Sequence, residues 1–210
     1  HGFDDYDELL RRSQEDPEWF WPAAIEDMGL EFASPWEQVV DLSRGPEWAT
    51  WFVGGRVSIA WNCAHRWGER QPDRPAVISL GEDGSRRVLS YAEMSDQVTR
   101  LAEALVRLGV EPGDRVAIFL PMSQEVAVAS HACAHVGAIQ VPIFSGFAAP
   151  AVAQRLEASE AKVAITTRSS LRRGREVPML EILEEARRRA PGVEHILLAP
   201  FDDVLADSEG

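Results

Sequence analysis

The chain has 210 residues, 45% of them hydrophobic, and a formal net charge of −13 at pH 7. This length can bury a sizeable core, in one domain or as part of a larger one, while the acidity argues against general binding to nucleic acid or to an anionic membrane. Residues 1–50 hold 13 acidic and 3 basic side chains, so they contribute −10 of the total. Two cysteines and no signal-peptide pattern predict a cytoplasmic protein without a disulfide framework.

Residues 1–68 form an acidic, Trp-rich block, because all seven tryptophans fall between Trp19 and Trp67. Asp16, Pro17 and Glu18 form a helix-start signal, and Pro22 should bend or shorten that helix. We expect further helices over 36–42 and 59–67, the latter ending before Gly68, with a loop over 46–55. Packing anchors are the commoner role for such aromatic side chains, and an aromatic ligand site is the alternative.

The second region, residues 69–210, starts with a predicted β-hairpin over 75–80 and 86–89, whose turn has glycine at both ends. Ser90 and Glu93 then form a capping box, and the helix that follows should end at Gly109. Its apolar residues recur on one face, so we expect that face to pack on a sheet.

The segment 109–166 alternates short apolar runs with helix-length segments. Strands are expected over 116–120, 139–144 and 163–166, with helices over 123–136 and 150–159 between them. This βαβαβ order predicts an α/β fold with a partly parallel sheet flanked by helices. Residues 126–154 carry no charge, but histidine, glutamine and proline interrupt the run and alanine dominates it, so a membrane span is not expected.

After residue 166 the sequence predicts a polar loop, a helix over 179–189, a strand near 195–198 and a weakly ordered acidic end over 201–210. Two groups suggest a metal at first sight: Cys63 beside His65, and His131 with His135 one helical turn apart. Neither is accompanied by further ligands at zinc spacing, so no metal site is predicted.

Six segments resemble the N-terminal part of acetyl-coenzyme A synthetase and its close acyl-CoA synthetase relatives, within the adenylate-forming superfamily. They are EDPEWFW, WFVGGRVSIAWNC, LSYAEM, GVEPGDRVAIFLPMSQEVAVA, IFSGFAAPAVAQRLEASEAKVAIT and LRRGR. The resemblance is collinear and covers nearly the whole chain. It implies that 69–210 is the first part of the large N-terminal domain of such an enzyme, ending before the phosphate loop.

The resemblance also implies a site for the nucleotide end of coenzyme A. Its expected residues are Phe144, Ser145 and Gly146 beside the adenine, with Arg172, Arg173, Gly174 and Arg175 near the 3′-phosphate. Arg forks can bind a phosphate bidentately, and Arg173 is expected to contribute least. Ser145 and Arg173 depart from the family, which more often has glycine and a small residue there. From composition alone, a solvated basic loop is the favoured interpretation of these arginines, and the resemblance reverses that preference.

The family's complete reaction uses ATP, Mg²⁺, coenzyme A and a small carboxylate. The ATP motifs and the catalytic lysine lie beyond this sequence, and no standard phosphate-binding glycine motif or nucleophile-and-base pair occurs in it. We therefore expect a ligase that needs the remainder of its polypeptide, with residues 1–210 inactive alone and no catalytic residue assigned. The alternative is a free-standing, non-catalytic module that binds a nucleotide or a protein.

Overall fold

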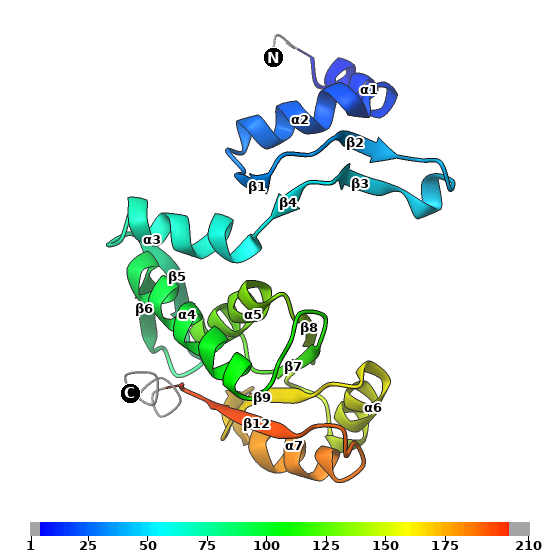
Figure 1. Ribbon diagram of the computed structural model, residues 1–210. Coiled ribbons are helices and arrows are strands. Elements are labelled where there is room, and N and C mark those ends of the chain that lie inside the picture. Colours follow the sequence, from blue (N-terminus) through cyan, green and yellow to red (C-terminus); the bar gives the residue numbers. More distant parts are fainter. Residues whose placement is uncertain (1–4, 202–210) are drawn as a thin grey trace. The chain divides into compact units, whose positions relative to one another are not determined.

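The computed structural model describes residues 5–201, which divide into two compact units, one ending at Ser58 and the other starting at Ile59 (Figure 1). The helical segment 59–70 belongs to the second unit, whereas the Trp-rich block of the sequence extends to residue 68. A separate role for residues 1–68 stays a prediction.

The first unit combines helices with two antiparallel strand pairs. Its elements are α1 (Tyr6–Glu15), α2 (Pro17–Asp27), β1 (Phe32–Ser34), β2 (Gln38–Asp41), η1 (Pro46–Trp48), β3 (Thr50–Val53) and β4 (Arg56–Val57). Strand β2 pairs with β3, and β1 pairs with β4. The predicted helix over 36–42 and the loop over 46–55 are therefore wrong. Val39 and Val40 are buried, Val40 lies opposite Trp51, and β-branched residues favour such a paired strand.

Aromatic rings pack against one another inside this unit. Phe32, Trp36 and Phe52 form a cluster with ring centroids 4.8–5.7 Å apart. The predicted start of α2 is confirmed, because the Asp16 carboxylate accepts a hydrogen bond from the Trp19 amide at 3.1 Å. The helix continues past Pro22 to Asp27.

The second unit begins with a helical segment in which a π-helical turn, η2 (Trp61–His65), leads into α3 (Arg66–Arg70). The expected end before Gly68 is wrong. A Cβ on Gly68 would lie 2.8 Å from the Ser95 Cβ and 3.1 Å from the Tyr91 carbonyl oxygen. Gly68 thus allows α3 to approach the next helix closely, and it does not terminate α3.

The predicted hairpin and capped helix are confirmed. Strands β5 (Pro75–Leu80) and β6 (Arg86–Ser90) pair antiparallel, and α4 (Tyr91–Arg107) follows directly. The Glu93 amide donates to the Ser90 hydroxyl at 3.3 Å, and the Ser90 amide donates to the Glu93 carboxylate at 2.8 Å. Gly109, just after the helix, has φ +78°, a left-handed conformation that glycine adopts without strain.

The centre of the second unit is a parallel sheet in the order β12-β9-β7-β8. Its strands are β7 (Arg115–Phe119), β8 (Ile139–Pro142), β9 (Val163–Thr167) and β12 (His195–Ala199), joined in part by α5 (Gln124–Val136), α6 (Ala149–Ser159) and α7 (Met179–Arg187). This confirms the βαβαβ prediction and the α/β class, with a fourth parallel strand where the sequence placed one.

Helices cover both faces of this sheet (Figure 1). Val116 and Ile118 point into a core shared with α4 and α5, while Ala117 and Phe119 point into a core shared with α6 and α7. All four side chains are at most 2% exposed, so β7 is buried on both faces, as the centre of a parallel sheet must be. Among residues 5–201, no helix has both the length and the apolar character that crossing a bilayer requires.

The polar segment after β9 is a second hairpin, where the sequence predicted a loop. Strands β10 (Ser170–Arg172) and β11 (Arg175–Val177) pair antiparallel around a turn at Arg173 and Gly174. Both turn residues have positive φ, +51° and +69°, which matches the two-residue turns of tight hairpins. The predicted weakly ordered end lies outside the described residues except for Phe201, which is buried.

The capping box predicts a stability difference between two N-cap serines. Ser90→Ala should lower the free energy of unfolding by about 1 kcal/mol, because it removes an acceptor from the first turn of α4. Ser123, at the N-cap of α5, makes no such bond to the helix, so Ser123→Ala should cost less. Urea denaturation of both variants measures this, and equal losses would contradict the role of the box.

Candidate functional site

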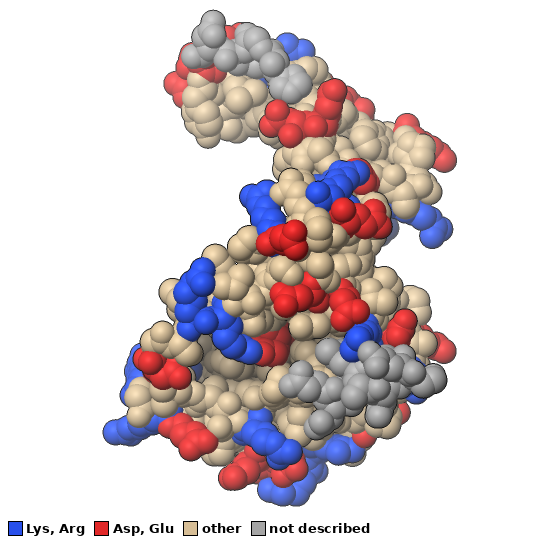
Figure 2. Space-filling model, turned by 90° about the vertical axis from the view of Figure 1, so that its left-hand side faces the viewer, with Lys and Arg blue, Asp and Glu red and all other residues tan. Residues whose placement is uncertain are grey.

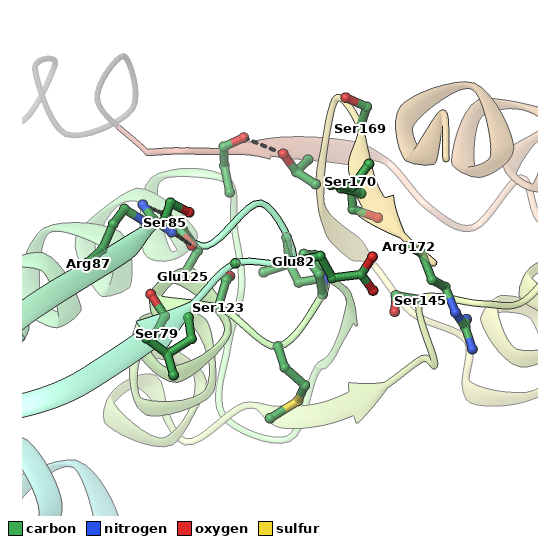
Figure 3. Close-up of a pocket in the computed structure, with 18 of the residues that line it drawn as sticks. Ser79, Glu82, Ser85, Arg87, Ser123, Glu125, Ser145, Ser169, Ser170 and Arg172 are labelled. Carbon is green, nitrogen blue, oxygen red and sulfur yellow. Dashed lines mark hydrogen bonds and ion pairs between the residues drawn. The ribbon is translucent and has the colours of Figure 1, made fainter. Parts of the chain in front are cut away.

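A cavity of about 600 Å³ lies where the parallel strands end. Leu120 to Met122 after β7, Phe144 after β8, Thr167 at the end of β9 and Pro200 after β12 contribute to its wall. The turn of the β5–β6 hairpin and strand β10 line it as well (Figure 3). Ligands of open parallel sheets gather at this edge, so the cavity is the candidate site.

Arg172 lies on the ring of Phe144 at the rim of the cavity. Its Cζ atom is 4.6 Å from the ring centroid, a distance suited to a cation–π contact. Phe147 supports Phe144 through an edge-to-face contact of 5.4 Å. A Cβ on Gly146 would lie 2.6 Å from the Arg172 Cζ, so only glycine leaves room for the guanidinium there. The resemblance implied an adenine beside residues 144–146; in the structure the Arg172 guanidinium lies next to Gly146, and the adenine contact stays a prediction.

The remaining predicted residues form one short element, which we call the arginine hairpin (β10–β11, residues 170–177). Arg172 and Arg175 lie directly opposite each other in its register, with Arg173 and Gly174 in the turn between them. Ser145 lines the cavity together with Phe144 and Arg172. The structure thus brings the two predicted groups, 144–146 and 172–175, into one place.

Like charges directly opposite each other on a strand pair are unfavourable. Within the described part of the chain, no carboxylate forms an ion pair with Arg172 or Arg175. On the face shown in Figure 2, Lys and Arg side chains lie among Asp and Glu side chains. Arg172 and Arg175 thus bring two like charges together in an acidic protein without an ion-pair contact to a described carboxylate, an arrangement suited to binding an anion.

Two acidic residues of this region were missed by the sequence analysis. Glu82, in the β5–β6 turn, accepts a hydrogen bond from the Gly174 amide at 3.1 Å. Glu125, in the first turn of α5, receives a bidentate pair of hydrogen bonds from Arg87 at 2.7 and 2.9 Å. Neither contact leaves a local signal in the sequence, because the partners are 92 and 38 positions apart.

The Arg87–Glu125 pair forms part of the cavity wall. The Glu125 side chain is 15% exposed and that of Arg87 is 52% exposed. Burial opposes ionisation of Glu125, but hydrogen bonds from Arg87 and Ser123 outweigh it and lower its pKa. The same pairing raises the pKa of Arg87, so both groups are held in their charged forms.

The structure pairs His65 with His135, whereas the sequence analysis considered Cys63 with His65 and His131 with His135. The His65 Nε2 lies 2.8 Å from the His135 Nδ1, and the His65 Nδ1 lies 2.9 Å from the Ser95 hydroxyl. His131 instead contacts the Ala127 carbonyl of its own helix. Burial, and then the charges of His135 and His131, lower the pKa of His65. Residues 5–201 contain no group of three or more side chains able to hold a metal ion.

A doubly covered parallel sheet with a cavity at its carboxyl edge is typical of α/β proteins that bind nucleotide-like ligands. Residues 64–209 match the family described as AMP-binding enzyme, and the chain belongs to this family. Residues 6–63 match the family model for the acetyl-coenzyme A synthetase N-terminus. The resemblance identified from the six sequence segments is thus confirmed.

The relatives point to the same group of proteins. The acetyl-coenzyme A synthetases of Deinococcus radiodurans and Streptomyces coelicolor are each 38% identical to this chain, over 92% and 91% of its length. A solved structure, acetoacetyl-CoA synthetase from Streptomyces lividans, is similar over 94% of the chain, with a TM-score of 0.86 and 30% identity. The chain spans 29% of the length of each of these two relatives and 30% of the solved structure.

The Arg87–Glu125 pair predicts a pH-dependent contribution to stability. Arg87→Met should lower the free energy of unfolding by about 1 kcal/mol at pH 7, because it leaves a mostly buried carboxylate without its partner. The folded-state pKa of Glu125 is lowered, so the contribution is present above the unfolded value and is lost as the pH falls through the folded one. The difference from wild type should therefore shrink below about pH 5.

The matched control for this variant is Arg86→Met. Arg86 is the residue before Arg87 in β6, and successive side chains of a strand alternate, so the Arg86 side chain points to the other face of the hairpin. Urea denaturation at pH 7, 5 and 4 compares the two variants. A loss for Arg87→Met that is independent of pH, or equal for both variants, would show that the ion pair is not its cause.

Proposed function

We propose that this chain works as part of an AMP-forming acyl-CoA synthetase, a ligase that adenylates a small carboxylate with ATP and then transfers the acyl group to coenzyme A. Family membership and the names of the relatives support this reading. We propose further that the chain contributes the site for the nucleotide end of coenzyme A. The observation that carries this second step is the pair of opposed arginines, of which Arg172 lines the cavity.

The chemistry of the site fits a phosphate monoester. The 3′-phosphate of coenzyme A has roughly two negative charges at neutral pH, and an Arg guanidinium can bind two of its oxygens at once. Arg172 is already held on Phe144, so part of the entropy of ordering this long side chain is lost before the ligand arrives. Arg175 lies opposite and can approach the same anion. Arg173 lies in the turn and contributes less.

Phe144, Ser145 and Gly146 belong to the same proposed site. The Phe144 ring contacts the Arg172 guanidinium through its face, and Gly146 provides the space in which the guanidinium lies. Ser145 lines the cavity beside them, where its hydroxyl can accept or donate a hydrogen bond to the nucleotide.

Only family membership supports the use of ATP and Mg²⁺ by the complete enzyme. The described residues hold no group of three or more metal-ligating side chains, so we assign no residue of this chain to Mg²⁺. Adenylation of the carboxylate and attack by the coenzyme A thiol are accordingly not attributed to residues described here.

The first test separates the 3′-phosphate from the rest of coenzyme A. In the full-length enzyme, Arg172→Ala or Arg175→Ala should raise the KM for coenzyme A by about tenfold, because each removes a charged hydrogen-bond donor. ATP–pyrophosphate exchange should stay nearly unchanged, since it precedes coenzyme A binding. The KM for dephospho-coenzyme A should change much less. If coenzyme A and its dephospho form lose affinity alike, the arginines support the fold and not the phosphate.

The second test addresses the space under Arg172. Gly146→Ala should also raise the KM for coenzyme A, because the added methyl group displaces the guanidinium from Phe144. In an Arg172→Ala background the same change should add little, since the displaced group is already absent. Gly192→Ala is the matched control, because a Cβ there meets nothing within 4 Å. Additive effects of the two substitutions would contradict the proposed role of Gly146.

A further inference from the structure

The arginine hairpin is attached to the rest of the second unit through its turn. Glu82, in the turn of the β5–β6 hairpin, accepts a hydrogen bond from the Gly174 amide at 3.1 Å. Figure 3 shows the Glu82 side chain directed toward strand β10, which carries Arg172. The backbone amides of Arg173 and Gly174 lower the pKa of Glu82, so its carboxylate is charged at neutral pH. One side chain therefore joins two hairpins that are distant in the sequence.

The geometry of the turn explains why a carboxylate fits there. Arg173 and Gly174 both have positive φ, and in such a two-residue turn their amides are not used by the strand ladder. Successive amides of left-handed residues point to one side and form a small concave site for an anion. Glu82 supplies that anion from within the chain.

The hairpin needs such support. Its strands have three residues each, and an isolated two-stranded hairpin is marginal in water. Arg172 and Arg175 face each other as like charges, which weakens the pair further. Without a contact that holds the turn, the distance between the Arg172 and Arg175 guanidinium groups would vary.

We propose that Glu82 is a positioning residue for the arginine hairpin: its carboxylate holds the Arg173–Gly174 turn, and thereby fixes Arg172 and Arg175 at the spacing that a phosphate monoester requires. This inference rests on the proposed coenzyme A function. Glu82 does not touch the ligand. It acts through the backbone of the turn, whereas the Arg172 guanidinium lies on the Phe144 ring.

The opposite reading is that Glu82 competes with the phosphate for the positive charges. Its carboxylate accepts a hydrogen bond from the Gly174 amide, and the turn amides lower its pKa more than the charges of Arg172 and Arg173 do. The turn amides are thus its main partners, which favours the positioning role. The two readings predict opposite signs for the effect of Glu82 on the affinity for coenzyme A.

The experiment compares Glu82→Ala, Glu82→Gln and Glu176→Gln in the full-length polypeptide. Glu82→Ala should raise the KM for coenzyme A about two- to fivefold, the range expected for one exposed charged contact, and leave ATP–pyrophosphate exchange unchanged. Glu82→Gln keeps a neutral acceptor, so its KM should stay near that of wild type. Glu176 is exposed in β11 next to Arg175, and its substitution removes the same charge without touching the turn.

Hydrogen exchange of residues 170–177 gives a readout that does not depend on coenzyme A. It should be about two- to fivefold faster in Glu82→Ala, close to wild type in Glu82→Gln and unchanged in Glu176→Gln. A lower KM in both Glu82 variants would overturn the proposal in favour of competition. So would faster exchange with an unchanged KM. If Arg172→Ala also leaves the KM unchanged, the proposed coenzyme A site has failed, and the positioning role fails with it.

Discussion

The order of the parallel strands determines where this protein can bind a ligand. Strand β8 follows β7 on one side of it, and the chain then crosses over β7 to place β9 on the other side. The two connecting helices, α5 and α6, consequently pack on opposite faces of the sheet and diverge beyond the end of β7. A gap opens at such a reversal, and the cavity lies there, between the residues that follow β7, β8 and β9.

The elements that the sequence predicted well are those determined by local rules. The capping box at Ser90 and the left-handed Gly109 after α4 depend on residues a few positions apart, and the strand-helix alternation depends on apolar runs within one segment. Strands β2 and β3 are different, because they form a pair in which Val40 lies opposite Trp51. The sequence analysis predicted a helix over 36–42, and the pairing of β2 with β3 overrode that local signal. The role of Gly68 was predicted wrongly for the same reason. A glycine is needed there because the neighbouring helix α4 packs closely against it, and local sequence does not show this.

The residues of the candidate site were predicted from the resemblance, but the contacts among them could not be predicted. The sequence grouped residues 144–146 with 172–175 but could not show that Arg172 lies on Phe144 or that Gly146 makes room for it. These contacts depend on where the β10–β11 hairpin lies beside the four-stranded sheet, which is a tertiary property. Glu82 was not singled out, since a hydrogen bond to a residue 92 positions away leaves no periodic pattern in the sequence.

The arginine hairpin contains destabilising features that the fold does not require. It lies outside the four-stranded sheet, it sets two like charges opposite each other, and it places Arg173, which is not glycine, at φ +51°. A hairpin that served only to connect β9 with α7 would be more stable with neutral residues at 172 and 175 and with a residue suited to positive φ at 173. Glu82 offsets part of the destabilisation at the turn, because its carboxylate accepts a hydrogen bond from a turn amide that the strand pairing leaves unpaired. The opposition of Arg172 and Arg175 is not offset by any described carboxylate in ion-pair contact, and an anion bound between them, as in the proposed coenzyme A site, would offset it.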